Sequence, residues 1–302
     1  MNLLYRIYFL LPRGFLGYKF DVLMYKTLKL FFDNLYVPYL HFILNFHFNG
    51  LNKKDREKKI IVSLTSHPGR INSVWISLAT ILRQKVKPDK VILWLAKEQF
   101  PELKLPKSLI KLKKYGLTIR WCDEDLRSHK KYYYAFKEFQ NDIVITVDDD
   151  FYYPNNLIKN LFDMYLKNPD NICATRVHKI TFSNELINPY NKWILNYLIE
   201  DSKDKNLFFT SGSGTLFTPN HFIDEVFNKE IFKKICFFAD DVWLNFLSKM
   251  SSINIISNNA FNKEMILVKS INDLGLVHYN VHKNGNDIQI KSTINHYKIK
   301  FD

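Results

Sequence analysis

The sequence predicts an α/β protein with a mixed, mostly parallel sheet flanked by helices. Between residues 60 and 147, short apolar runs rich in β-branched residues alternate with segments whose apolar residues have helical spacing. This alternation is typical of βαβ units with right-handed crossovers. The chain has 302 residues, of which 47% are hydrophobic, so it can form one large domain with a substantial core.

The first half of this domain contains four predicted strands, Ile60–Thr65, Lys90–Ala96, Leu117–Cys122 and Ile143–Val147. Predicted helices run over about residues 71–84, 105–115 and 130–140. No G-x-G-x-x-G follows the first strand, and no Walker P-loop occurs in the sequence. A dinucleotide oxidoreductase and a P-loop ATPase are therefore disfavoured.

The second half is predicted to continue with a helix over residues 154–168 and a strand over residues 172–177. Small residues flanked by apolar ones between Asn206 and Pro219 suggest a strand–turn–strand whose backbone lets a ligand come close. An ordinary tight hairpin has the same pattern. A buried helix is predicted from Asp240, because apolar residues follow it at Val242, Trp243 and Leu244.

Three consecutive aspartates, Asp148, Asp149 and Asp150, follow the strand Ile143–Val147 directly. The carboxyl ends of strands are where open α/β sheets bind ligands. Neighbouring carboxylates repel one another unless a positive group compensates them, and a hard divalent cation prefers oxygen ligands. The alternative is a solvated turn that caps the next helix. The sequence favours a metal site that uses Asp148 and Asp150.

A second acidic pair, Asp240 and Asp241, opens the predicted helix. Carboxylates there are favourable to the helix dipole, so N-capping is one explanation. A carboxylate held over a pocket can also act as a general base. Two late histidines, His278 and His282, are candidates for a further metal ligand, although a lone histidine is more often structural.

The first 55 residues are predicted to form a separate helical segment, and residues 56–302 the main domain, with the charged run 53–59 at the boundary. Residues 14–33 suggest an amphipathic helix, and the first 50 residues are rich in Phe, Tyr and Leu. Polar residues interrupt the segment too often for a transmembrane helix or a signal peptide. We expect contact with a membrane interface, with packing on the main domain as the alternative.

The net charge of +13 favours anionic partners. Three well-separated cysteines, Cys122, Cys173 and Cys236, suggest neither a disulfide framework nor a zinc site. The expected location is therefore the reducing cytoplasm, with peripheral contact to the inner face of the cell membrane.

Taken in order, these motifs resemble the GT-A fold glycosyltransferases, in particular bacterial family-2-like enzymes that build surface polysaccharide. The resemblance covers residues 60 to the C-terminus. Asp148-Asp149-Asp150 resembles the family's Asp-x-Asp motif, and Ser211-Gly212-Ser213-Gly214 resembles its glycine loop. Ala239-Asp240-Asp241 resembles its x-Glu-Asp motif, with Asp240 in place of the glutamate.

The resemblance implies transfer of a sugar from a nucleoside diphosphate sugar, with UDP favoured, to an acceptor hydroxyl of a glycan or lipid-linked glycan. Inversion at the anomeric carbon is implied by a base at Asp241, with Asp240 as the alternative base. Mn²⁺ or Mg²⁺ is implied at Asp148 and Asp150, with His282 as a further ligand. The implied residues for the nucleotide sugar are Thr65, His67, Arg70, Asp123, Lys130, Asp148, Asp149, Gly212, Ser213 and Gly214.

Two other functions remain open. Clustered aspartates and a basic surface also occur in metal-dependent nucleases and nucleotidyltransferases. No nucleic-acid-binding motif accompanies them here, so nucleic acid is not an expected partner. A non-catalytic carbohydrate-binding protein of the same fold is the second alternative, and the donor sugar, the acceptor, the linkage and the oligomeric state do not follow from the sequence.

Overall fold

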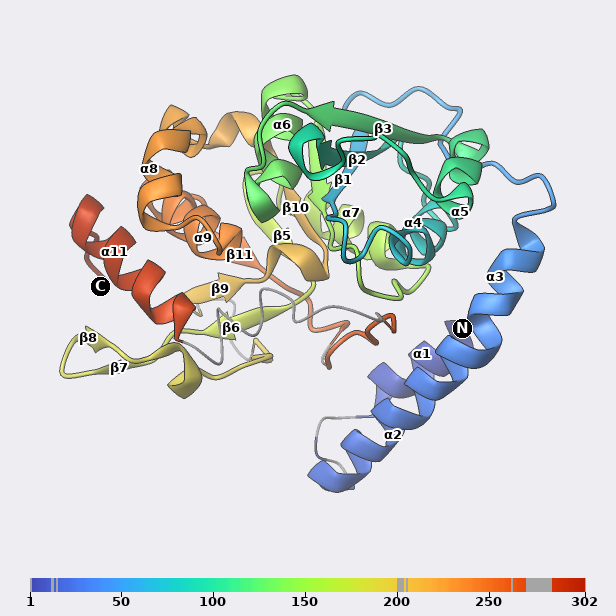
Figure 1. Cartoon of the computed structure of the whole chain (residues 1–302). Coiled ribbons are helices and arrows are strands. Elements are labelled where there is room, and N and C mark those ends of the chain that lie inside the picture. The colour runs from blue at the N-terminus through green and yellow to red at the C-terminus, as the bar shows by residue number, and fades with distance from the viewer. Residues whose placement is uncertain are drawn as a thin grey trace.

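A computed structural model describes residues 2–11, 14, 16–199, 204, 206–261, 263–269 and 284–301. Its centre is a seven-stranded sheet with the order β11-β5-β10-β4-β1-β2-β3 and helices on both faces (Figure 1). Four of its six neighbouring strand pairs are parallel, and only β10 runs antiparallel to its neighbours. The predicted α/β fold with a mostly parallel sheet is confirmed.

The four strands of the first half lie side by side and parallel. They are β1 (Ile60–Thr65), β2 (Lys90–Ala96), β3 (Leu117–Cys122) and β4 (Ile143–Thr146). The bounds of the first three are those predicted from the sequence. In β1, Ile60, Val62 and Leu64 belong to one hydrophobic cluster and Ile61 to another, because successive side chains point to opposite faces. Both faces of this strand are therefore covered.

The other half of the sheet differs from the prediction. The predicted strand over residues 172–177 is interrupted, because β5 (Ile172–Ala174) ends in the central sheet and β6 (Val177–Lys179) pairs with β9 (Leu207–Phe209) in a second sheet. The strand β10 (Thr215–Phe217) inserts between β4 and β5. Since β9 and β10 lie in different sheets, the segment between them is not a tight hairpin.

Two short strands, β7 (Phe182–Ser183) and β8 (Leu186–Ile187), form a third sheet, and β11 (Ile255–Ile256) extends the central one. The helices α4, α5 and α7 contribute to one hydrophobic cluster, and α6, α8, α9 and α11 to the other. Their bounds are α4 (Val74–Leu82), α5 (Lys107–Lys111), α6 (Lys130–Glu138), α7 (Leu157–Lys167), α8 (Lys229–Ile235), α9 (Asp240–Met250) and α11 (Gly285–Tyr297).

The N-terminal segment forms α1 (Asn2–Leu10), α2 (Tyr18–Phe31), a π-helical turn η1 (Phe32–Tyr36) and α3 (Val37–Ile43). Figure 1 shows α2 and α3 as one long blue rod with α1 beside it. Tyr5, Phe32 and Leu40 are buried in the cluster that covers the α4 and α7 face of the sheet. The N-terminal segment therefore packs on the main domain, which was the alternative to membrane contact in the sequence analysis. Membrane contact and the boundary near residue 55 remain predictions. Among the described helices, none has both the length and the apolar character that a membrane crossing requires.

Candidate active site

Loops that follow β1, β4 and β9 meet at one edge of the central sheet. Thr65 ends β1, Asp148 follows β4 by two residues, and a short 3₁₀ turn, η6 (Ser211–Ser213), lies between β9 and β10. The backbone amide of Asp148 donates to the carbonyl of Gly212 (3.0 Å). The aspartate motif and the glycine loop, separated by more than 60 residues in the sequence, are thus in direct contact.

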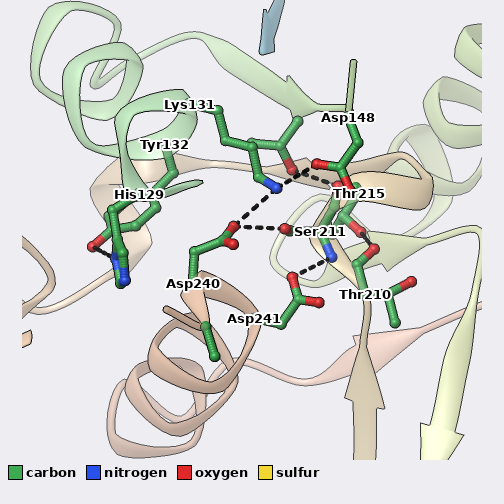
Figure 2. Close-up of polar contacts among 12 residues, drawn as sticks. His129, Lys131, Tyr132, Asp148, Thr210, Ser211, Thr215, Asp240 and Asp241 are labelled. Atoms are coloured by element: carbon green, nitrogen blue, oxygen red, sulfur yellow. Dashed lines mark hydrogen bonds and ion pairs between the residues drawn. The ribbon is translucent and has the colours of Figure 1, made fainter. Parts of the chain in front are cut away.

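Lys131, in the first turn of α6, lies between the two acidic motifs (Figure 2). Its ammonium contacts Asp148 at 2.7 Å and Asp240 at 3.1 Å, and its side chain is only 3% exposed. Figure 2 shows the lysine ammonium between the carboxylates of Asp148 and Asp240. A buried cation between two anions stabilises both of them, because each charge compensates the cost of burying the others.

The pKa values of these groups are shifted in different directions. Burial by itself would lower the pKa of Lys131, but Asp148, Asp240 and Asp241 outweigh burial and raise it. Burial would raise the pKa of Asp240, but Lys131 and His129 outweigh it and hold that pKa below its usual value. Burial and the neighbouring Asp240 raise the pKa of Asp241 to about 6. Two adjacent carboxyl groups thus differ in basicity, which is typical of groups with different roles.

The glycine loop holds both acidic motifs. The Ser211 amide donates to Asp241 (2.8 Å) and the Ser211 hydroxyl donates to Asp240 (2.7 Å). A Cβ atom at Gly212 would lie 1.7 Å from Oδ2 of Asp148, so only glycine allows this carboxylate its position. Gly214 has a φ of +104°, a conformation that glycine adopts without strain. The loop therefore sets the separation between Asp148 and the acidic pair.

The other two aspartates of the motif face the loop after β1. Arg70 contacts Asp149 at 2.9 Å and Asp150 at 2.7 Å. The Ser66 hydroxyl also donates to Asp149. Asp149 is buried, whereas the side chain of Asp148 is 40% exposed and accessible to a ligand. Arg70 is therefore in contact with the aspartate motif, and its contact with a nucleotide remains a prediction.

Of the remaining residues predicted to bind the nucleotide, some lie near the aspartate motif and others do not. Thr65 lies at the end of β1 and donates to the Trp94 carbonyl (2.8 Å), and His67 follows it in the same loop as Arg70. Lys130 is buried and pairs with Asp125, so Lys131 rather than Lys130 reaches the aspartates. Asp123 is 90% exposed and pairs with Lys97 on the rim (2.6 Å). His278 and His282 lie outside the described residues.

Sequence reasoning did not single out Arg176 and Tyr190. The Nε of Arg176 donates to Thr210 at the start of the glycine loop (2.9 Å). Burial is the main cause that raises the pKa of Tyr190 to about 12, while Arg176 opposes the shift and Asp241 adds to it. The charges of Arg176 and Asp241 thus both act on Tyr190. Arg176 fell inside the strand predicted over residues 172–177, and the break after β5 that places it in a loop was not visible in the local sequence pattern.

A divalent metal fits the donor chemistry of the aspartate motif. Carboxylate oxygens are hard ligands, and one of them, on Asp148, is accessible from solvent. In the part of the chain that the structure describes, no three His, Cys, Asp or Glu side chains are grouped to hold a metal by themselves. A metal ion bound by the described carboxylates would thus take its remaining ligands from oxygens of a substrate or of water, as is common for Mg²⁺.

Comparison with known proteins gives one family match. Residues 77–224, just under half of the chain, match the model of the family described as glycosyl transferase family 2. This range contains the three aspartates, Arg176 and the glycine loop, and the match supports glycosyl transfer. No curated protein matches the chain.

Solved structures with a similar fold include a mannosyltransferase from Pyrobaculum calidifontis in complex with GDP-mannose and Mn²⁺. It has 11% identity and a TM-score of 0.48, and the match covers 91% of this chain and 74% of that one. A 4-diphosphocytidyl-2C-methyl-D-erythritol synthase from Anaerococcus prevotii has 15% identity and a TM-score of 0.42, with 75% and 99% coverage. These similarities are too distant to assign an activity.

Proposed function

We propose that this protein transfers a sugar from a nucleoside diphosphate sugar to an acceptor hydroxyl, with Asp241 as the general base. The observation that carries the proposal is the shared glycine loop. Through Ser211 it holds Asp241, and through Gly212 it contacts Asp148. The proposed base and the proposed metal ligand are thus held by the same loop, and an in-line displacement needs reacting groups that are held in a defined relative position.

Asp241 has properties that suit a base at neutral pH. A carboxyl group with a pKa of about 6 is mostly ionised at pH 7 yet is more basic than an ordinary aspartate. Asp240 has a lowered pKa and is held by Lys131 and Ser211, so we assign it a positioning role. Attack by the activated hydroxyl from the side opposite the leaving group would invert the anomeric carbon.

The donor side is assigned to the aspartate motif and the loop after β1. We propose that Asp148 and Asp150 hold Mn²⁺ or Mg²⁺, which would stabilise the negative charge that develops on the leaving diphosphate. Arg70 would contact a phosphate or ribose oxygen once it is released from one of its two carboxylates. UDP is the nucleotide that we would test first, as the resemblance implies.

The acceptor side is assigned to the region around Tyr190. Tyr190 lies beside Trp193 (4.9 Å between ring centroids), and the charge of Asp241 contributes to the raised pKa of Tyr190. Aromatic rings present flat apolar faces together with a polar edge, which suits a sugar ring. We propose that the acceptor is a glycan or lipid-linked glycan of the cell surface, and that Arg176 contacts one of its oxygens.

A product assay tests this proposal. The protein is incubated with Mn²⁺ and a panel of nucleotide sugars, with and without glycan acceptors, and release of the nucleoside diphosphate is followed. We expect release from one donor that depends on Mn²⁺ and is lost in Asp241→Asn. Release of pyrophosphate from a nucleoside triphosphate would instead indicate a nucleotidyltransferase, and an unchanged rate in Asp241→Asn would contradict the assignment of the base.

A further inference from the structure

An exposed apolar strip runs along the outer side of the N-terminal helices. Its members are Leu23 (62% exposed) and Leu30 (64%) on α2, Leu35 (61%) on η1, Tyr39 (46%) and Phe42 (60%) on α3, and Phe46 (56%) in the turn that follows α3. On α1, Leu3, Ile7 and Leu10 are also exposed. With 1.5 Å per residue, the strip from residue 23 to residue 46 is about 35 Å long.

The strip lies on one side of the rod because of the π-helical turn. Leu35, Tyr39, Phe42 and Phe46 follow one another by four, three and four residues, which keeps them on one helix face. Leu30 and Leu35 are five residues apart, and the wider turn of η1 between Phe32 and Tyr36 allows this step without leaving the face. The geometry thus extends the apolar face over both helices.

The opposite side of the same rod is buried in the core. Leu28, Phe32, Tyr36, Leu40 and Leu44, spaced by four residues, are all less than 9% exposed. A helix that is apolar on one side needs only that side to attach it to a core. The rod is apolar on both sides, so packing on the main domain does not explain the exposed strip.

The charges of this segment are sorted in the same way. The two acidic residues among the first 50 face inward, Asp21 toward Lys263 (2.9 Å) and Asp33 toward Tyr152 (2.8 Å). Arg6, Lys19 and Lys26 are exposed. The outer side therefore presents large apolar side chains together with positive charge.

We infer that this strip docks on the surface of an anionic lipid bilayer. Apolar side chains would enter the boundary of the acyl chains while the exposed lysines contact acidic headgroups. A second copy of the chain is a poorer occupant, because two such faces would bring like charges together, whereas headgroups neutralise them. The inference does not depend on the proposed sugar transfer.

The docked face would be connected to the active site. The Tyr5 hydroxyl donates to the Tyr152 carbonyl, and the Ile266 amide donates to Tyr5 (3.1 Å). The Val268 amide donates to the Asp150 carbonyl (2.7 Å). The N-terminal helices thus support the backbone that directly follows the three aspartates, which would hold the active site at a fixed position relative to the bilayer.

Vesicle co-sedimentation of the full chain tests the inference. The vesicles are phosphatidylcholine, with or without phosphatidylglycerol. We expect the wild type to pellet with the anionic vesicles. L30D combined with F42D should lower partitioning about tenfold or more, because two apolar side chains that would enter the bilayer are replaced by charged ones. L166D combined with L186D is the matched control, since both leucines are exposed and lie off the strip (63% and 74%).

A second pair of variants tests whether the positive charge of the N-terminal helices contributes to vesicle binding. K19E combined with K26E should weaken binding to anionic vesicles, and the remaining binding should depend less on salt. K291E combined with K298E makes the same charge change on the other side of the molecule, at α11, and should bind more strongly than K19E with K26E. An equal loss of vesicle binding in the two double variants would contradict binding through the strip, and would indicate that binding responds only to the net charge of the protein.

A probe on the strip distinguishes lipid from a second copy. The three native cysteines are buried, so Leu30→Cys can be labelled with an environment-sensitive dye in the folded protein. We expect a blue shift on addition of anionic vesicles and quenching by brominated lipid. A blue shift that instead follows protein concentration, with a doubled mass by light scattering and no vesicle binding, would overturn the inference in favour of a dimer.

Discussion

At the scale of single residues, the proposed chemistry depends most on Asp241. We expect Asp241→Asn to lower kcat by about 10²- to 10⁴-fold, because the amide cannot accept the proton of the attacking hydroxyl. Donor binding should change little, since Asp148 and Arg70 remain. Steady-state kinetics together with donor titration measure both quantities, and equal losses in kcat and donor affinity would contradict a role as base.

The raised pKa of Asp241 predicts a pH profile. The base acts in its ionised form, so kcat should rise as the pH increases through about 6 and level off above it. The effect on stability has the opposite sign. A carboxyl whose pKa is raised on folding contributes stability below its usual pKa, near 4, and loses it as the pH rises through 6. Asp241→Asn should therefore melt no lower than the wild type at pH 7.5, which differential scanning fluorimetry can check.

Lys131 stabilises the folded protein, because its positive charge compensates the negative charges of Asp148 and Asp240. Lys131→Met should destabilise the protein by about 3–5 kcal/mol at pH 7.5, since the buried Asp240 would lose its cation. The loss should be smaller near pH 4.5, where an uncompensated carboxyl takes up a proton. Urea unfolding at the two pH values measures this difference. Lys137→Met, at an exposed position on α6 where the lysine donates to the Tyr133 hydroxyl (2.7 Å), controls for the removal of a lysine from this helix. An equal loss of stability at both pH values in Lys131→Met would contradict the role of Lys131.

At the scale of structural elements, the glycine loop between β9 and β10 is the part that joins the two acidic motifs. Gly212→Ala would place a methyl group 1.7 Å from Oδ2 of Asp148, so the carboxylate has to move. We expect metal-dependent nucleotide binding to fall about tenfold or more, as a displacement near 1 Å at such a site commonly produces. Gly50→Ala makes the same change at a crowded position outside the aspartate motif and the glycine loop, where the added Cβ would lie 2.0 Å from the Tyr115 carbonyl oxygen, and is the matched control. Unchanged binding in Gly212→Ala would show that Asp148 is not a ligand.

The elements that the sequence predicts well are those determined by local pattern. The bounds of β1, β2 and β3 match, because a buried parallel strand is a short apolar run between polar residues. The position of the three aspartates after β4 was predicted for the same reason, while their role as a metal site remains a prediction. The insertion of β10 beside β4, the break after β5 and the position of Arg176 depend on pairing between distant segments, which a local pattern does not contain.

At the scale of the whole molecule, the N-terminal helices and the sheet share one hydrophobic cluster. Leu40 is fully buried in it, so Leu40→Ala should lower the free energy of unfolding by about 2–5 kcal/mol. Leu35→Ala, at an exposed position in the preceding turn, should change it by about 0.5 kcal/mol or less. Chemical denaturation monitored by circular dichroism measures both. Similar small losses in the two variants would mean that the helices form a separate unit with a boundary near residue 55.

The most direct test of the central claim is calorimetric titration of UDP into the wild type and Asp150→Ala, each with Mn²⁺ and with chelator. We predict binding that requires Mn²⁺ in the wild type and is lost in Asp150→Ala, while Asp241→Asn binds as the wild type does. Retained metal-dependent binding in Asp150→Ala would contradict the assignment of the ligands. Failure of UDP, GDP, dTDP and CMP alike to bind would contradict the proposed nucleotide-sugar site itself.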